Sequence, residues 1–205
     1  GNDGRDCYYT SFGSTNCPGG QDGEVNLGAL NRQATAKNIL SVGASENVRN
    51  TLAMHSRSYF SVCGNCDWYG TPIKNDLEGD NAEGMAAFSN RGPTSDGRIK
   101  PDLVAPGIMI CSARAEEANL ATGGACSDST HDGSSTPMYM TMSGSSMATP
   151  VVAGASAMAR QYLREVAGIQ FPRSDLIRAL LVNGADDLGD ADVPNNMEGL
   201  SLIHI

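Results

Sequence analysis

Directly before a long block of small apolar residues, the chain reads Gly144-Ser145-Ser146-Met147-Ala148-Thr149-Pro150. No residue from Met147 to Ala159 is charged, and a helix that is apolar on every face is typical of a buried helix. Pro150 fits only in the first turn, where backbone N–H groups have no partner within the helix. We therefore predict a buried helix that begins near Ser145 or Ser146 and continues to Val166.

Short apolar runs before this helix predict buried strands of a parallel sheet. A second helix is predicted over Ser174–Asn183, with Ser174 as its N-cap and Gly184 as its C-terminal stop. Residues 50–84 are predicted to form a long surface excursion. Strands that alternate with helices indicate an α/β fold. The predicted strands are Ile39–Ala44, Met85–Phe88, Leu103–Ala105 and Ile108–Ile110.

Composition excludes several function classes. The chain has 205 residues, enough for one domain, and a formal net charge of -9. A nucleic-acid-binding surface would need a basic patch, and the sequence has none. No apolar run reaches the roughly 18–20 residues that span a bilayer. We therefore expect no nucleic-acid partner and no membrane segment in this chain.

The six cysteines fall into three local pairs within Gly-, Ser- and Asp-rich stretches. Six cysteines allow about 15 connectivities, which sequence alone does not resolve. Local pairing predicts disulfides Cys7–Cys17 and Cys111–Cys126, whereas Cys63–Cys66 is tightly spaced and could instead serve a metal or redox role. Disulfides form in oxidising compartments, so the protein is expected to be secreted or lumenal.

Ser146 lies at the predicted start of the buried helix, where chemistry and structure offer two readings. Helix-end N–H groups and the positive end of the helix dipole favour negative charge that develops nearby, as at a nucleophile. A serine after a Gly/Ser loop is equally typical of an ordinary N-cap. Local chemistry alone leaves both readings open.

A longer set of motifs, in a fixed order, separates these readings. The heptad at Gly144–Pro150 resembles the serine-bearing motif G-[TS]-S-M-A-[ST]-P of the subtilisin-like (subtilase) family. The stretch Phe88–Gly107 resembles that family's F-S-[SN]-x-G-P…K-P-D-[VL]-x-A-P-G pattern, and Ala36–Ala44 its A-x-N-x-[IL]-x-V-G-A strand. Gly1-Asn2-Asp3-Gly4 resembles its A-A-G-N-[ED]-G loop.

The resemblance implies a fold and a reaction. Residues 1–199 would form the C-terminal part of a subtilase catalytic domain: a subtilisin-like parallel sheet flanked by helices, incomplete because the N-terminal part is missing. Ser146 would be the nucleophile and Asn2 the side-chain donor to the oxyanion. The protein would be a serine endopeptidase that hydrolyses polypeptides through an acyl-enzyme. Its own propeptide and a following β-rich domain are further expected partners.

The family's triad Asp and His precede the oxyanion asparagine, and neither of their motifs occurs in this chain. This fragment alone is therefore expected to be inactive, because Ser146 would have no general base. His131, 15 residues before Ser146, is a candidate general base, but its surroundings match no motif of the family. A catalytically inactive subtilase-fold scaffold (pseudoprotease) stays open as an alternative. A lipase-like hydrolase is disfavoured by Ala148, where G-x-S-x-G needs a glycine.

Two further expectations concern calcium and the C-terminus. The chemistry requires no cofactor, but structural calcium is an option for Asn75–Asn81, a segment rich in oxygen ligands without EF-hand spacing. A solvated acidic loop is the alternative. Residues 200–205 read Leu-Ser-Leu-Ile-His-Ile where a family turn should complete, and they match the translation of a common transposase adapter. We expect them to be a non-native tail.

Overall fold

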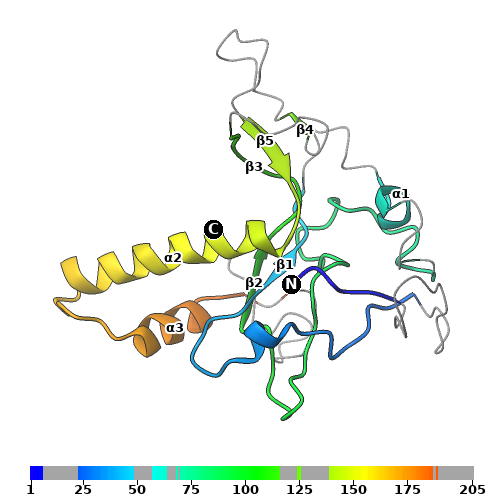
Figure 1. The fold of residues 1–205 in the computed structure, drawn as a ribbon. Helices are drawn as coiled ribbons and strands as arrows, with labels where there is room; N and C mark the ends of the chain where they lie inside the picture. Colours follow the sequence, from blue (N-terminus) through cyan, green and yellow to red (C-terminus); the bar gives the residue numbers. More distant parts are fainter. Residues whose placement is uncertain are drawn as a thin grey trace, which may run out of the picture.

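The structure, a computed structural model, describes residues 1–6, 23–48, 57–63, 68, 70–115, 124–125, 139–186 and 188. Two small sheets and two long helices organise these residues (Figure 1).

Two parallel strands form the centre of the molecule. β1 (Val42–Ser45) pairs with β2 (Leu103–Pro106), with Val42 opposite Leu103 and Ser45 opposite Pro106. Most residues of both strands are buried, as expected for strands covered on both faces. The predicted strand at Leu103–Ala105 is confirmed. The strand predicted at Ile39–Ala44 is also present, but it begins three residues later and ends one residue later.

Three antiparallel strands project from this centre in the order β3-β5-β4 (Figure 1). They are β3 (Ile110–Ala113), β4 (Gly124–Ala125) and β5 (Tyr139–Met142). The prediction of a strand at Ile108–Ile110 is wrong for its first two residues. Ile108 and Met109 are fully buried in a bend that precedes β3, and Met109 has a φ of 50°.

The predicted strand Met85–Phe88 is also wrong. A single antiparallel bridge joins Met85 to Ser45, and the N–H of Ala86 donates to the carbonyl of Ala44 at 3.1 Å. The chain then turns, because the N–H of Ser89 donates back to the Ala86 carbonyl at 2.9 Å. Burial of this short run comes from the turn's position against β1 and not from strand pairing.

Both predicted helices are confirmed, with one correction at a cap. α2 spans Ser145–Glu165 and α3 spans Ser174–Asn183. The N-cap of α3 is Arg173 and not Ser174, which is the first helical residue. Gly184 ends the helix as predicted, and its N–H donates to the Leu180 carbonyl. A 3-10 turn (η1, Arg32–Thr35) and a short helix (α1, Tyr59–Cys63) complete the elements.

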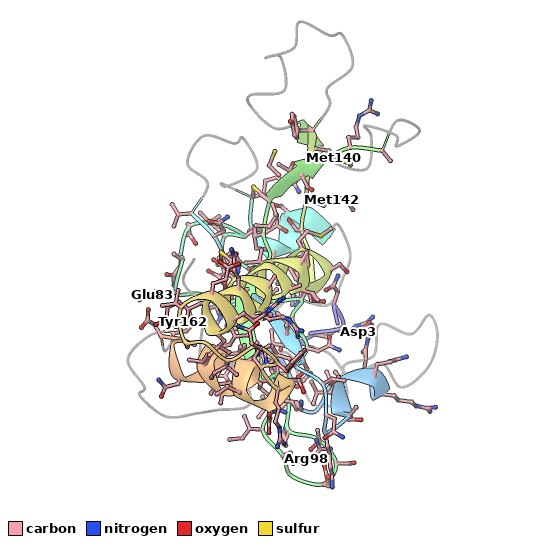
Figure 2. All side chains as sticks on the ribbon, turned by 90° about the vertical axis from the view of Figure 1, so that its left-hand side faces the viewer. Asp3, Glu83, Arg98, Met140, Met142 and Tyr162 are labelled. Carbon is pink, nitrogen blue, oxygen red and sulfur yellow. The ribbon has the colours of Figure 1, made fainter. Side chains whose placement is uncertain are left out.

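The prediction that α2 is buried all round is wrong, because the described residues cover only one of its sides. Ala148, Val152 and Ala155 pack inward, and α2 contacts β1, β2 and α3. The opposite side is open, because Ala153, Gly154 and Ala157 are exposed, and Tyr162 near the C-terminal end of the helix is 57% exposed (Figure 2).

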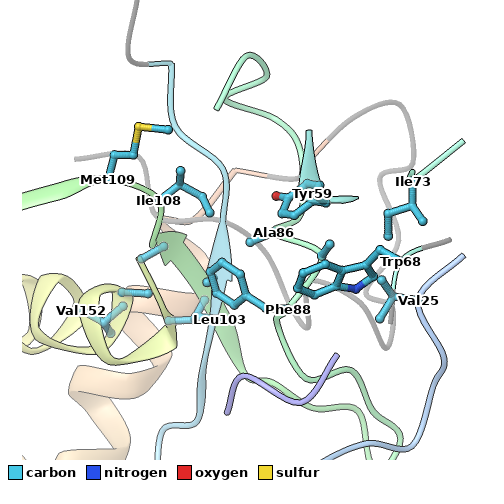
Figure 3. Close-up of a cluster of buried hydrophobic side chains, with 14 of the residues drawn as sticks. Val25, Tyr59, Trp68, Ile73, Ala86, Phe88, Leu103, Ile108, Met109 and Val152 are labelled. Atoms are coloured by element: carbon cyan, nitrogen blue, oxygen red, sulfur yellow. The ribbon is translucent and has the colours of Figure 1, made fainter. Parts of the chain in front are cut away.

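The main core runs from α2 across the parallel strands to the segment between them (Figure 3). The prediction that residues 50–84 form a surface excursion is wrong for the buried ones among the described residues and holds for the exposed ones, such as residues 80–83. Tyr59 is fully buried, Trp68 and Ile73 are 8% exposed, and the rings of Tyr59 and Trp68 meet edge to face with centroids 5.5 Å apart. Aromatic burial of this size makes the segment part of the core.

Over the described ranges, no helix has both the length and the apolar character needed to cross a membrane. Cys111 is disulfide-bonded. Each predicted pairing includes a cysteine side chain outside the described residues, so the pairings stay predictions.

Candidate active site

Gly107 joins the parallel strands to the start of α2. Its N–H donates to the Ser45 carbonyl at 3.0 Å, and its own carbonyl accepts from the N–H of Gly144 at 2.8 Å. A Cβ at position 107 would lie 2.6 Å from the Cβ of Ala44, so only glycine allows this approach. The helix therefore begins at the carboxyl ends of β1 and β2, where ligands of α/β proteins usually bind.

Ser146 is the second residue of α2, and its side chain is exposed. Its hydroxyl makes no hydrogen bond to any residue in the described part of the chain. Its neighbour Ser145 is only 6% exposed, and the Ser145 carbonyl accepts from the hydroxyl of Thr149 at 2.8 Å. The fold thus buries one serine of the pair and presents the other to solvent at a fixed point.

Asn2 reaches this helix start from the opposite end of the sequence. Its Oδ1 accepts two hydrogen bonds, from the N–H of Ser145 at 2.8 Å and from the Ser145 hydroxyl at 2.7 Å. With Oδ1 held in this way, the Nδ2 group is left as the free end of the amide. A Cβ placed on Gly144 would lie 2.9 Å from Nδ2, so Nδ2 lies beside the helix start.

Among the described residues, the backbone N–H groups at the start of α2 all have hydrogen-bond acceptors except that of Ser146. The Ser145 N–H is bound to Asn2, and the N–H groups of Met147 and Ala148 both point to the Gly144 carbonyl, at 2.9 and 3.4 Å. The Ser146 N–H has no partner within the described ranges. Two donors, this N–H and Asn2 Nδ2, therefore accompany the exposed hydroxyl at the positive end of a 21-residue helix. Such a group of donors can hold an oxygen on which negative charge develops.

The family follows from comparison with known proteins. The family model described as "Subtilase family" matches residues 1–199. The chain belongs to the subtilase family.

Relatives of this subtilase chain are proteases by name. It is 32% identical over 211 residues to the serine protease/ABC transporter B family protein tagD of Dictyostelium discoideum, an alignment that covers 77% of the chain and 11% of tagD. It is 40% identical over 111 residues to the serine protease AprX of Bacillus subtilis, which covers 54% of the chain and 22% of AprX. The chain thus spans a small part of either relative's length.

One solved structure supports the fold. The CspB protease of Clostridium perfringens matches with a TM-score of 0.52 at 24% identity, over 86% of this chain and 27% of that one. At this identity the likeness shows the fold alone, and it confirms the predicted subtilisin-like α/β class of this subtilase.

The structure places Asn2 against Ser145, the residue directly before the second predicted site residue, Ser146. The three histidines, His55, His131 and His204, all lie outside the described residues, as does the predicted tail at 200–205. Sequence reasoning missed Ser145 as the anchor of the Asn2 side chain. The family motif contained that residue, but its partner is 143 positions away in the sequence.

The expectation of structural calcium at Asn75–Asn81 stays a prediction. Across the described ranges, no group of three or more His, Cys, Asp or Glu residues is placed to hold a metal ion. Glu78 of this segment is buried and lies 3.8 Å from the guanidinium of Arg57, so the alternative of a wholly solvated loop is wrong for this residue. Calcium enters none of the chemistry that follows.

Proposed function

We propose that the complete protein is a serine endopeptidase and that Ser146 is its nucleophile. The observation that carries the proposal is the arrangement at the start of α2: an exposed Ser146 hydroxyl with no partner among the described residues, the Ser146 N–H, and the Asn2 amide, whose oxygen is held by Ser145. Membership of the subtilase family supports peptide bonds as the substrate class.

In this mechanism the Ser146 Oγ attacks the scissile carbonyl carbon and loses its proton to a general base. The carbonyl oxygen becomes an oxyanion, which accepts hydrogen bonds from the Ser146 N–H and from Asn2 Nδ2. Collapse expels the amine, which takes the proton, and water then hydrolyses the acyl-enzyme. We assign the general base to a histidine that precedes Asn2 in the complete protein. An aspartate that orients this histidine would also precede Asn2.

Asn2 can assist only if its amide is held with Nδ2 outward. The two hydrogen bonds from Ser145 to Oδ1 support this orientation, since a reversed amide would turn two donors toward the Ser145 N–H. Removal of such a donor lowers kcat about 10²–10³-fold, a magnitude measured in subtilisin, a member of this family, and not worked out from this structure.

We further propose that the protein acts in an oxidising compartment, secreted or lumenal, which the disulfide-bonded Cys111 supports. Residues 1–199 would be the C-terminal part of its catalytic domain, with a propeptide and a β-rich domain elsewhere in the complete chain.

The test is peptide hydrolysis by the complete protein and two serine variants. We expect Ser146→Ala to abolish turnover and Ser145→Ala to retain part of it, because Ser145 acts only through Asn2. Full activity in Ser146→Ala would refute the proposal. An inactive but folded wild-type protein would instead favour the alternative of a subtilase-fold scaffold without catalysis.

A further inference from the structure

Asn90 lies directly behind the Asn2 loop. It belongs to the Phe88-Ser89-Asn90-Arg91-Gly92 stretch and is 3% exposed, although it is polar and belongs to no helix or strand. A buried polar side chain is stabilised by its hydrogen bonds, and the backbone N–H, the Oδ1 and the Nδ2 of Asn90 each have a partner.

Two of these bonds fall on either side of Asn2. The Asn90 N–H donates to the carbonyl of Gly1 at 3.1 Å, and the Asn90 Oδ1 accepts from the N–H of Asp3 at 2.5 Å. The peptide groups before and after Asn2 are therefore both attached to one buried residue. Gly4 extends the attachment, because its N–H donates to the Phe88 carbonyl at 2.8 Å.

The other end of the Asn90 side chain is tied to a second segment. Its Nδ2 donates to the carbonyl of Ala29 at 2.6 Å and to Oδ1 of Asn31 at 2.8 Å. That segment is itself paired with the turn, since the N–H of Ala29 donates to the Arg91 carbonyl at 3.0 Å. The amide of Asn90 thus uses both its donors and its acceptor, and it has one well-defined orientation.

We propose that Asn90 is a positioning residue that fixes the backbone of the oxyanion donor Asn2. The inference rests on the proposed role of Asn2. Ser145 orients the Asn2 side chain and Asn90 places the backbone that carries it, so the two hold Asn2 Nδ2 at a set point. An oxyanion donor must lie within about 2.7–3.1 Å of the developing charge, and a displacement of about 1 Å can cost 100-fold in rate.

Substitution of the Asn90 side chain breaks only one of the two hydrogen bonds that flank Asn2. Asn90→Ala removes the acceptor for the Asp3 N–H but leaves the bond to the Gly1 carbonyl, so one flank of Asn2 is released while the other stays attached. Because the oxyanion forms only in the transition state, the loss should fall on kcat and leave KM nearly unchanged.

The test is a double-mutant cycle in the complete protein, with kcat and KM measured for wild type, Asn2→Ala, Asn90→Ala and the double variant on one peptide substrate. We expect Asn90→Ala to lower kcat roughly 10–100-fold with KM within about twofold. In the Asn2→Ala background, Asn90→Ala should cause no further loss, because there is no donor left to position.

The matched control is Ser89→Ala, one residue earlier. The Ser89 hydroxyl is fully buried and accepts from the N–H of Ala44 at 2.9 Å, so its removal also breaks a buried hydrogen bond but on the β1 side. We expect Ser89→Ala to lower Tm and leave kcat unchanged. If Asn90→Ala does not fold, the same cycle is run with Asn90→Ser, whose shorter hydroxyl should give a smaller loss of kcat that again vanishes in Asn2→Ala.

Two results would overturn the inference alone: an unchanged kcat in the Asn90 variant, or an equal loss with and without Asn2. A wild-type kcat in Asn2→Ala would overturn the oxyanion role itself and the positioning role with it, so failure of the proposed site is distinguishable from failure of Asn90.

Discussion

Glu46 should make the stability of this protein fall as pH rises. It follows β1 directly and is 2% exposed. Its Oε1 accepts from the Tyr59 hydroxyl at 2.6 Å, whereas its Oε2 is buried without a hydrogen-bond partner in the described part of the chain. Asp76 and Asp80 add negative charge nearby. Burial, aided by these carboxylates, raises the pKa of Glu46 to about 8.

The sign of the effect follows from the direction of the shift. The pKa of Glu46 is higher in the folded than in the unfolded protein, so the folded state binds the proton more tightly. The resulting stabilisation is fully present below about pH 4.5, the ordinary pKa of the side chain, and is lost as pH rises through about 8. Within this window one proton contributes about 1.4 kcal/mol per pH unit, or about 3 kcal/mol between pH 5 and pH 7.

Glu78 adds to the same trend over part of the range. Its side chain is 6% exposed, and burial raises its pKa to about 7 even though Arg57 opposes the shift. Wild-type stability should therefore fall more steeply below pH 7 than above it.

The assay is urea unfolding at pH 5, 6, 7 and 8 for wild type, Glu46→Gln and Glu83→Gln. Glutamine keeps an oxygen that can accept from the Tyr59 hydroxyl but does not titrate, so Glu46→Gln should reduce the slope of unfolding free energy by about 1.4 kcal/mol per pH unit. Glu83 is exposed and serves as the control that removes a surface carboxylate. Equal slopes in wild type and Glu46→Gln would show that Glu46 does not titrate with a raised pKa in the folded protein.

Three further substitutions test packing around the parallel strands and the start of α2. Asp102 is 2% exposed, and its carboxylate binds Lys100 at 2.5 Å, the Ser41 N–H at 2.7 Å and the Arg178 guanidinium. Asp102→Ala should lower the free energy of unfolding in urea by about 3–5 kcal/mol, because the buried Lys100 loses its counter-charge. A loss below about 1 kcal/mol would contradict this prediction. Gly144 has a φ of 152° and a Cβ there would meet Asn2 Nδ2 at 2.9 Å, so Gly144→Ala should lower kcat of the complete protein at least about 10-fold by displacing that donor. Gly154→Ala, within α2 and facing open space, should keep kcat and raise stability by about 0.5–1 kcal/mol, and a similar kcat loss in both variants would count against a local effect.

Local signals predicted the helices well. The start of α2 follows from where Pro150 is tolerated, and the end of α3 follows from Gly184, so both depend on residues within one turn of the boundary. The fold class and the expectation that Asn2 lies at the start of the Ser146 helix came from motifs in a fixed order, because nothing local to Asn2 shows that it meets a helix 143 residues later.

What the sequence did not predict depends on contacts between distant segments. Met85–Phe88 is apolar enough for a strand, but the described residues pair it with β1 through a single β-bridge, because the chain turns at Ser89. Trp68 lies in a polar stretch, yet it joins the core through Tyr59. Asn90 was visible only as one letter of a motif, and its role depends on three separate segments that meet around it.

The most direct test of the central claim is to find which serine reacts with a fluorophosphonate probe in the complete protein. The probe attaches covalently to an activated serine, and peptide mapping by mass spectrometry distinguishes Ser146 from its neighbour. We expect the adduct on Ser146, its loss in Ser146→Ala without loss of fold, and retained but slower labelling in Ser145→Ala. An adduct on Ser145, or undiminished labelling in Ser146→Ala, would contradict the assignment of the nucleophile.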